Sequence, residues 1–182
     1  MTSVSAGRPW RSVRRARSAD VPAVRALVDH YTPDRRLLGK ATVTLYEDVQ
    51  EFFVACDGDG LVVGCGALHV LWADLAEVRT LAVAPAALGR GIGHLLLDRL
   101  LQQARDLGVG RVFCLTFETA FFGRHGFEAV RDVLVEAGVQ AELLQSTDEG
   151  VAEFLDLVRV RPNTLGNTRM LCLLPTDPED HR

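Results

Sequence analysis

The sequence predicts an α/β fold, a single domain with a mixed sheet flanked by helices. Three observations predict it. Short apolar runs of strand length recur along the chain between amphipathic helix patterns. The Asp-Gly-Asp-Gly turn at 57–60 joins two of these runs as a hairpin. A further run, ending at Ala84, passes through a glycine-rich turn directly into the longest helical pattern.

Turn residues and apolar periods set the expected elements. The expected strands cover residues 13–17, 52–56, 61–71, 76–84, 112–115, 127–130 and 170–174. The expected helices cover residues 21–30, 44–50, 91–107, 118–125 and 133–144. Asp20 is placed to cap the first helix, with Pro22 in the permitted first turn. Gly108 and Gly126 are expected to end the third and fourth helices.

The length is that of one domain. The 182 residues suffice for a domain with a real core, and the chain contains no internal repeat or linker. We expect this domain to span residues 12–175, after a disordered basic tail at 1–11 and before a polar tail at 176–182. The apolar stretch 151–160 has two interpretations, a homodimer interface or core packing.

Composition and charge limit the function. The net charge is −4, yet residues 1–17 hold five arginines and no acid, which leaves 15 basic and 24 acidic residues elsewhere. This acidic remainder argues against nucleic acid as the main partner. No apolar run is long enough to span a membrane, and no signal-peptide core is present. The four cysteines are dispersed without metal-ligand spacing, so we expect no metal and a cytoplasmic protein with reduced thiols. His69 is interpreted as a strand residue and His125 as a helix C-terminal residue, neither with a catalytic role.

The glycine-rich turn at 88–93 follows an apolar strand and opens a helix. Glycines let backbone N–H groups converge, and the helix start adds unpaired N–H groups and the positive end of the dipole. Such a turn can cradle a phosphorylated ligand; a plain strand-to-helix turn is the alternative. It is not a P-loop, because no Lys follows Gly93. It does not match the dinucleotide fingerprint either, because His94 stands where a third glycine is required.

The pattern that remains, Gly-x-Gly after a strand ending in Val-Ala-Pro, resembles the acetyl-CoA pyrophosphate loop of the GCN5-related N-acetyltransferase (GNAT) family. Residues 14–21 resemble that family's first strand and helix cap, and residues 121–127 resemble its aromatic helix running into Gly-Phe. The resemblance covers residues 13–174. It implies the acetyltransferase fold, with a mostly antiparallel mixed sheet, and acetyl-CoA as cosubstrate. The residues that it implies for the cofactor are Leu81, Ala82, Val83, Leu88, Gly89, Arg90, Gly91, Ile92, Gly93 and His94.

Two positions depart from the family pattern. Leu88 stands where the loop usually begins with Gln or Arg. Backbone N–H groups carry most of the phosphate binding, and Arg90 either compensates or is a solvated loop charge. Phe122 stands where many members have a Tyr that protonates the departing thiolate. Thr116 or a water is left for that role.

Phe122 and three other segments are similar to the acetyltransferase domain of bacterial N-acetylglutamate synthases, above all to a short actinobacterial form without the amino-acid-kinase-like domain. These segments are residues 37–40 with the helix that follows, 77–83 and 167–171. The resemblance implies direct transfer of acetyl from acetyl-CoA to the α-amine of L-glutamate in a ternary complex, the first step of arginine biosynthesis. The alternatives are acetylation of glutamine, another amino acid or a protein N-terminus, and a non-catalytic acyl-CoA-binding regulatory module.

Amine acetylation needs a base, a held thioester carbonyl and an oriented acceptor. Glu77 is the candidate base, acting directly or through a water; the alternative is a strand carboxylate paired with Arg79. Backbone N–H groups near Leu81 and Val83 are expected to hold the carbonyl oxygen. An amino-acid acceptor needs cations for its carboxylates, although each cation also has a surface-charge interpretation. The candidate substrate-binding residues are Lys40, which is the sole lysine, Arg79, Thr80, Asn167, Thr168 and Arg169.

Overall fold

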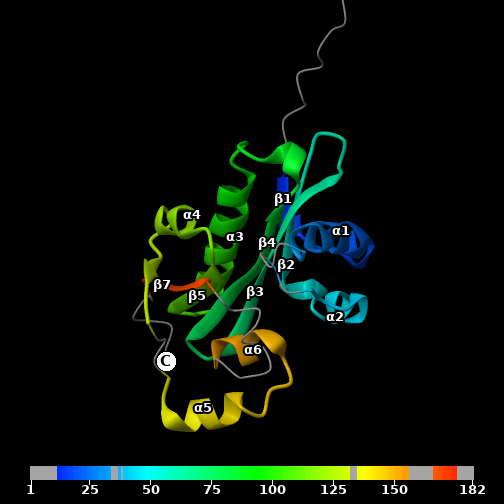
Figure 1. The fold of residues 1–182 in the computed structure, drawn as a ribbon. Coiled ribbons are helices and arrows are strands. Elements are labelled where there is room, and N and C mark those ends of the chain that lie inside the picture. The colour runs from blue at the N-terminus through cyan, green and yellow to red at the C-terminus, as the bar shows by residue number, and fades with distance from the viewer. Residues whose placement is uncertain (1–11, 34–36, 38, 132–134, 156–165, 176–182) are drawn as a thin grey trace, which may run out of the picture.

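The computed structural model describes residues 12–33, 37, 39–131, 135–155 and 166–175, so the expected tails at 1–11 and 176–182 lie outside the described residues. Among these residues a seven-stranded sheet forms in the order β1-β2-β3-β4-β5-β7-β6 (Figure 1). Neighbouring strands are antiparallel except β4 and β5, which are parallel. The expectation of a mixed, mostly antiparallel sheet is confirmed. The strands are β1 (Ser12–Arg15), β2 (Phe52–Cys56), β3 (Val62–Trp72), β4 (Leu75–Val83), β5 (Arg111–Thr116), β6 (Glu128–Ala129) and β7 (Thr168–Leu173).

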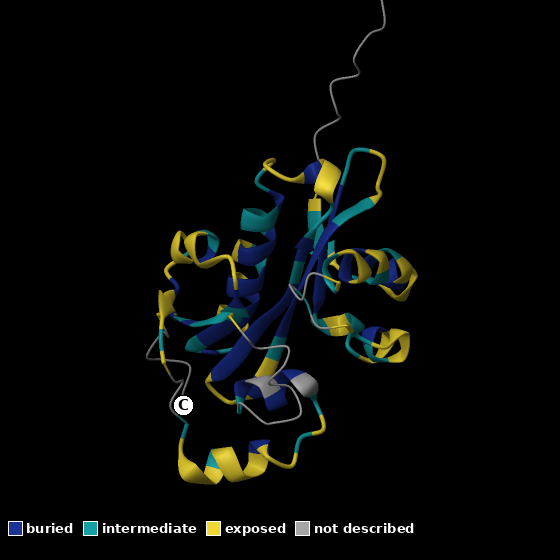
Figure 2. Cartoon of the chain, in the orientation of Figure 1, coloured by how far each residue is buried: buried dark blue, intermediate teal, exposed yellow. Residues whose placement is uncertain are grey.

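Helices cover both faces of the sheet. α3 lies against one face, and α1 and α2 lie on the other side (Figure 1). Figure 2 shows the sheet between them as buried and the outer sides of the helices as exposed. The helices are α1 (Val21–Tyr31), α2 (Thr42–Glu47), α3 (Ile92–Asp106), α4 (Thr119–Gly123), α5 (Ala137–Leu143) and α6 (Glu149–Phe154), with 3₁₀ turns η1 (Ser18–Asp20), η2 (Val49–Glu51) and η3 (Pro85–Ala87).

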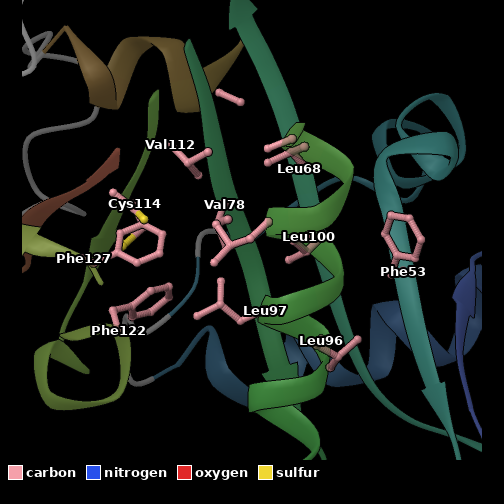
Figure 3. Packing of buried hydrophobic residues seen from close by; sticks show 14 of the residues in the cluster. Phe53, Leu68, Val78, Leu96, Leu97, Leu100, Val112, Cys114, Phe122 and Phe127 are labelled. Carbon is pink, nitrogen blue, oxygen red and sulfur yellow. The ribbon is translucent and has the colours of Figure 1, made fainter. Parts of the chain in front are cut away.

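The alternation of strand side chains explains the two helical layers. On β2, Phe53 belongs to the cluster that packs on α3, and Phe52 belongs to the cluster that packs on α1. Because successive strand side chains point to opposite faces, a strand that is apolar throughout must be covered on both. Figure 3 shows α3 packed on the sheet through three fully buried leucines, Leu96, Leu97 and Leu100.

Most expected elements are present with shifted ends. The helices expected at 44–50 and 118–125 are α2 and α4, the strands expected at 127–130 and 170–174 are β6 and β7, and the helix expected at 133–144 is α5, with residues 133 and 134 outside the described residues. The first strand ends at Arg15 because the chain turns into η1. Asp20 precedes α1 but does not cap it. Its carboxylate accepts the Arg17 N–H at 2.7 Å and the Arg14 guanidinium at 2.7 Å instead.

The short helix α6 is not expected from the sequence, because six residues are too few to show a helical period. Its start is capped by Asp148, whose Oδ1 accepts the Val151 N–H at 2.9 Å. Val151 and Phe154 are buried in a cluster that includes Phe113 of β5. Core packing is therefore the correct interpretation for these two residues of the 151–160 stretch, while residues 156–160 lie outside the described residues.

The parallel strands β4 and β5 separate after a short ladder. Their register pairs Leu75 with Arg111 and ends where Glu77 meets Phe113. Beyond that pair β4 continues to Val83 and β5 continues to Thr116, but the two strands no longer pair with each other. The backbone of β4 past Glu77 therefore has a strand partner only on its β3 side, which leaves polar groups on the other edge for a ligand.

A bulge distorts β4 within this separated half. On β3, Cys65 faces Ala82 and Ala67 faces Arg79, so β4 has one more residue than β3 between these pairs. Thr80, inside the bulge, has a φ of 58°, in the left-handed region that a β-branched residue rarely adopts. The bulge and its strained backbone lie on the part of β4 whose other edge is not paired with β5.

Candidate active site

A cavity of about 890 Å³ lies along the separated half of β4. It extends from the glycine-rich turn, past the ends of β5 and α4, to α6 and the segment before α2. Its lining includes most of the candidate residues, namely Lys40, Glu77, Arg79, Thr80, Leu81, Ala82, Val83, Leu88, Gly89, Gly91, Ile92, Gly93, His94, Thr116 and Asn167. Three other candidates among the described residues do not line it: Arg90, Thr168 and Arg169.

The glycine-rich turn forms a cradle of backbone N–H groups at one end of this cavity. Gly89 and Gly91 have φ of 74° and 77°, and a Cβ on either would meet no atom within 4 Å. These positions therefore require glycine for backbone conformation rather than for space. Gly91 precedes α3, and no side chain caps the helix, so its first N–H groups are open to an anion. The residues present fit the diphosphate of a nucleotide cofactor.

Gly93 has a different reason to be glycine. A Cβ on it would lie 3.3 Å from Cε2 of Phe121, on α4. The aromatic helix α4 thus packs directly on the first turn of α3. Phe122, beside it, is buried and packs edge-on against Phe127 with ring centroids 5.2 Å apart. It lines the cavity but has no proton to donate.

Glu77 is a buried carboxylate at the point where β4 and β5 separate. Its side chain lines the cavity, and its Oε2 has no hydrogen-bond partner in the described part of the chain. Burial raises the pKa of Glu77 above its ordinary value, and the nearby charge of Arg79 opposes only part of that rise. A buried carboxylate oxygen without a donor is suited to accept a proton from a ligand.

Arg79 is held by two carboxylates from distant elements. Its Nη1 donates to Asp148 Oδ1 at 2.9 Å, before α6, and its Nη2 donates to Glu51 Oε2 at 3.2 Å, at the end of η2. Glu51 also lies 2.6 Å from His69 Nδ1. Burial raises the pKa of Asp148, but Arg79, the Val151 N–H and the nearby His69 together outweigh it and the pKa is lowered. The alternative of a Glu77–Arg79 hydrogen-bonded pair does not describe the geometry, since Arg79 directs its described hydrogen bonds to Asp148 and Glu51.

The other candidate polar residues have mixed environments. Lys40 Nζ lies 3.5 Å from Asp48, a long contact that leaves the ammonium able to bind a further anion. Arg169, on β7, donates to the Phe154 carbonyl oxygen at 2.9 Å. The Thr116 hydroxyl accepts the Glu118 N–H at 2.9 Å and keeps its own proton for donation.

Sequence reasoning missed several residues of this site. The Tyr31 hydroxyl donates to the Val83 carbonyl oxygen at 2.6 Å and ties α1 to the end of β4. Gly150 lines the cavity near Glu77, and Asp148 accepts a hydrogen bond from Arg79 beside it. His125 lies 2.7 Å from His94. In the described part of the chain, no helix is long and apolar enough to cross a membrane, and no group of His, Cys, Asp or Glu is arranged to hold a metal ion.

The close packing of α6 on the site can be tested by substituting Gly150. A Cβ there would lie 2.7 Å from Arg79 Nη1 and 2.9 Å from Glu77 Oε2. We expect Gly150→Ala to lower the free energy of unfolding by about 1–3 kcal/mol through overpacking, measured by urea unfolding. Gly138→Ala, in α5, is the matched control because a Cβ there meets nothing within 4 Å, and a gain of up to about 1 kcal/mol is expected from helix propensity. Equal stability of the two variants would contradict this packing.

Comparison with known proteins gives consistent matches. The model described as the Acetyltransferase (GNAT) family matches residues 15–127. An amino-acid acetyltransferase of Mycobacterium tuberculosis is 62% identical over 164 residues, covering 89% of this chain and 94% of that protein. A crystal structure of a Mycobacterium tuberculosis protein in complex with CoA and NLQ superposes with a TM-score of 0.88 at 60% identity, covering 91% of this chain and all of that one. N-acetylglutamate synthase from Neisseria gonorrhoeae, complexed with coenzyme A and N-acetyl-glutamate, superposes with a TM-score of 0.71 at 26% identity; the match covers 90% of this chain and 35% of that protein.

The matched region contains the features that the site is built from. Residues 15–127 include the separated half of β4, the glycine cradle and the aromatic helix α4. The similarity to the Mycobacterium tuberculosis protein extends over nearly the full length of both chains. The resemblance inferred from the glycine-rich turn is confirmed: the chain belongs to the GNAT acetyltransferase family.

Proposed function

We propose that this protein is an N-acetylglutamate synthase, which transfers the acetyl group of acetyl-CoA to the α-amine of L-glutamate in the cytoplasm as the first step of arginine biosynthesis. One observation carries the proposal: the Glu77 carboxylate, whose Oε2 has no hydrogen-bond partner among the described residues, lines the same cavity as the glycine cradle. The names and bound ligands of the similar proteins support the cosubstrate and the amino-acid acceptor. The four cysteines are free and buried, in keeping with a reducing compartment.

Acetyl-CoA supplies an acetyl thioester when bound. The cradle at Gly89–Gly93 would hold its diphosphate through backbone N–H groups, which require no particular side chain. The open edge of β4 would align its amide-rich arm, and N–H groups near Leu81 and Val83 would hold the carbonyl oxygen.

Glu77 takes the proton of the substrate ammonium, directly or through a water. Burial raises its pKa, which makes it a stronger base than an exposed carboxylate while it remains ionised. The amine then carries a free lone pair for attack. No covalent enzyme intermediate is required, because a base, an acceptor site and a cofactor cradle share one cavity.

The substrate carboxylates need a cation that is not already neutralised. Lys40 meets this need better than Arg79, because Arg79 donates to two carboxylates and Lys40 has one long contact with Asp48. Thr80 and Asn167 line the same cavity and can donate hydrogen bonds to the acceptor. Thr168 and Arg169 lie on β7 outside the cavity lining, and their roles in substrate binding stay predictions.

The proposal is tested by measuring release of the CoA thiol from acetyl-CoA against a panel of amino acids that includes glutamate and glutamine. We expect the largest kcat/KM with glutamate. A larger value with glutamine or another amine would replace the substrate while keeping the reaction. Binding of acetyl-CoA with no thiol release in any assay would instead favour a non-catalytic acyl-CoA-binding module.

Replacing the base separates chemistry from cofactor binding. We expect Glu77→Gln to lower kcat by roughly 10²- to 10⁴-fold, because the amide cannot accept the ammonium proton. Calorimetric affinity for CoA should be unchanged. In the unmodified protein kcat/KM should rise as pH increases through the raised pKa of Glu77. This rise in the pH profile should therefore occur above the ordinary carboxyl pKa of 4.5. A Glu77→Gln variant with full kcat would contradict the assignment.

Removing the lysine that is proposed to bind the carboxylate of the acceptor should affect substrate binding more than the chemical step. We expect Lys40→Ala to raise KM for glutamate about tenfold or more with kcat little changed, since a charge-assisted hydrogen bond contributes roughly 1.5–3 kcal/mol. Steady-state kinetics with glutamate as the varied substrate measure this. Arg111→Ala is the control, because Arg111 forms an ion pair with the exposed Asp74 away from the cavity lining. An unchanged KM in Lys40→Ala would remove Lys40 from the substrate site.

A further inference from the structure

Three side chains form a chain of polar contacts, one hydrogen bond and one ion-pair contact, from the surface to the cofactor end of the cavity. His94 Nδ1 lies 2.7 Å from His125 Nε2, and His125 Nδ1 lies 3.0 Å from Asp98 Oδ1. His94 and Asp98 are one turn apart on α3, and His125 follows α4. His94 lines the cavity, whereas the Asp98 side chain is 64% exposed. We name these three residues the histidine chain.

The contacts of the histidine chain favour one arrangement of its protons. The Asp98 carboxylate oxygen lies 3.0 Å from His125 Nδ1, so a proton on Nδ1 is favoured over a lone pair facing that oxygen. A neutral His125 then accepts at Nε2, and His94 Nδ1–H is the donor. His94 Nε2 has no described hydrogen bond. One additional proton on that nitrogen makes the histidine pair cationic, and Asp98 offsets the charge.

Packing holds the His94 ring beside the glycine cradle. A helical side chain tilts toward the helix N-terminus, so a residue in the first turn of α3 covers the cradle at Gly91. The ring is fixed between Phe121, with centroids 4.8 Å apart, and His125, with centroids 5.0 Å apart. The other charged groups around this end are Arg90 on the turn and, at the two ends of α4, Glu118 and Arg124.

We propose that the histidine chain is a proton-loaded binding element for the cofactor diphosphate. When the diphosphate enters the cradle, the pair takes up a proton from solvent, and His94 Nε2–H donates to a phosphate oxygen. Imidazole is the side chain that can make this change near neutral pH. It supplies the side-chain donor that Leu88 cannot. The inference rests on the proposed function only in requiring CoA at the cradle.

The test measures binding and proton uptake without turnover. Calorimetry of CoA binding near pH 7, in two buffers of different ionisation enthalpy, should show proton uptake by the unmodified protein. His94→Asn should abolish the uptake and weaken CoA about tenfold or more, as expected for loss of a charged hydrogen bond. Asp98→Asn, at an exposed position that does not endanger folding, should reduce both. Asp106→Asn, on the same helix and also exposed, should leave both unchanged.

Ligand variants identify the group that is bound. Removing the 3′-phosphate (dephospho-CoA) should preserve the proton uptake, and removing the diphosphate as well (pantetheine) should abolish it in the unmodified protein. Uptake that disappears with dephospho-CoA would overturn the assignment to the diphosphate. CoA affinity unchanged in both His94→Asn and Asp98→Asn would overturn the inference itself, even if kcat falls. Failure of the unmodified protein to bind CoA would instead contradict the proposed function.

Discussion

The active site depends on the early separation of two parallel strands. A sheet normally satisfies the backbone groups of a central strand from both sides, and β4 is satisfied in this way only up to Glu77. Beyond it, a ligand must replace the missing strand. The same separation places the Glu77 carboxylate where the open edge of β4 begins, and the glycine cradle follows the end of β4 in the same cavity. The proposed cofactor site and the proposed base are therefore both positioned by one feature of the sheet.

The charges around Glu77 favour an amine at this end of the cavity. Glu77, Glu51 and Asp148 surround the single guanidinium of Arg79. With all three carboxylates ionised, they outnumber the guanidinium that they surround. Such a group attracts a substrate ammonium and repels a substrate carboxylate. Arg79, chemically plausible as a carboxylate ligand from sequence, already donates to Asp148 and Glu51, and its charge opposes part of the rise in the pKa of Glu77.

The sequence predicts the parts of the site that depend on local chain chemistry. Fifteen-residue α3 has a clear apolar stripe, and the turn before it needs glycines whatever surrounds it. It does not predict partners joined through the fold. Arg79 and Asp148 are 69 positions apart, and His94 and His125 are 31 apart, so neither pair leaves a local pattern. α6 is missed for the related reason that a six-residue helix is defined by its tertiary contacts rather than by its own period.

Two locally unfavourable features of the site, a strained backbone and a buried carboxylate, both lie on β4. A β-branched residue at φ 58° and a buried carboxylate are each unfavourable locally, by about 1–3 kcal/mol for the backbone alone. On the same strand, Val78 packs into the cluster on the α3 side and Ala82 into the cluster on the α1 side. The strand is thus held from both faces by apolar burial and along one edge by β3. The bulge at Thr80 lies in the part of the strand whose remaining edge is not paired with β5.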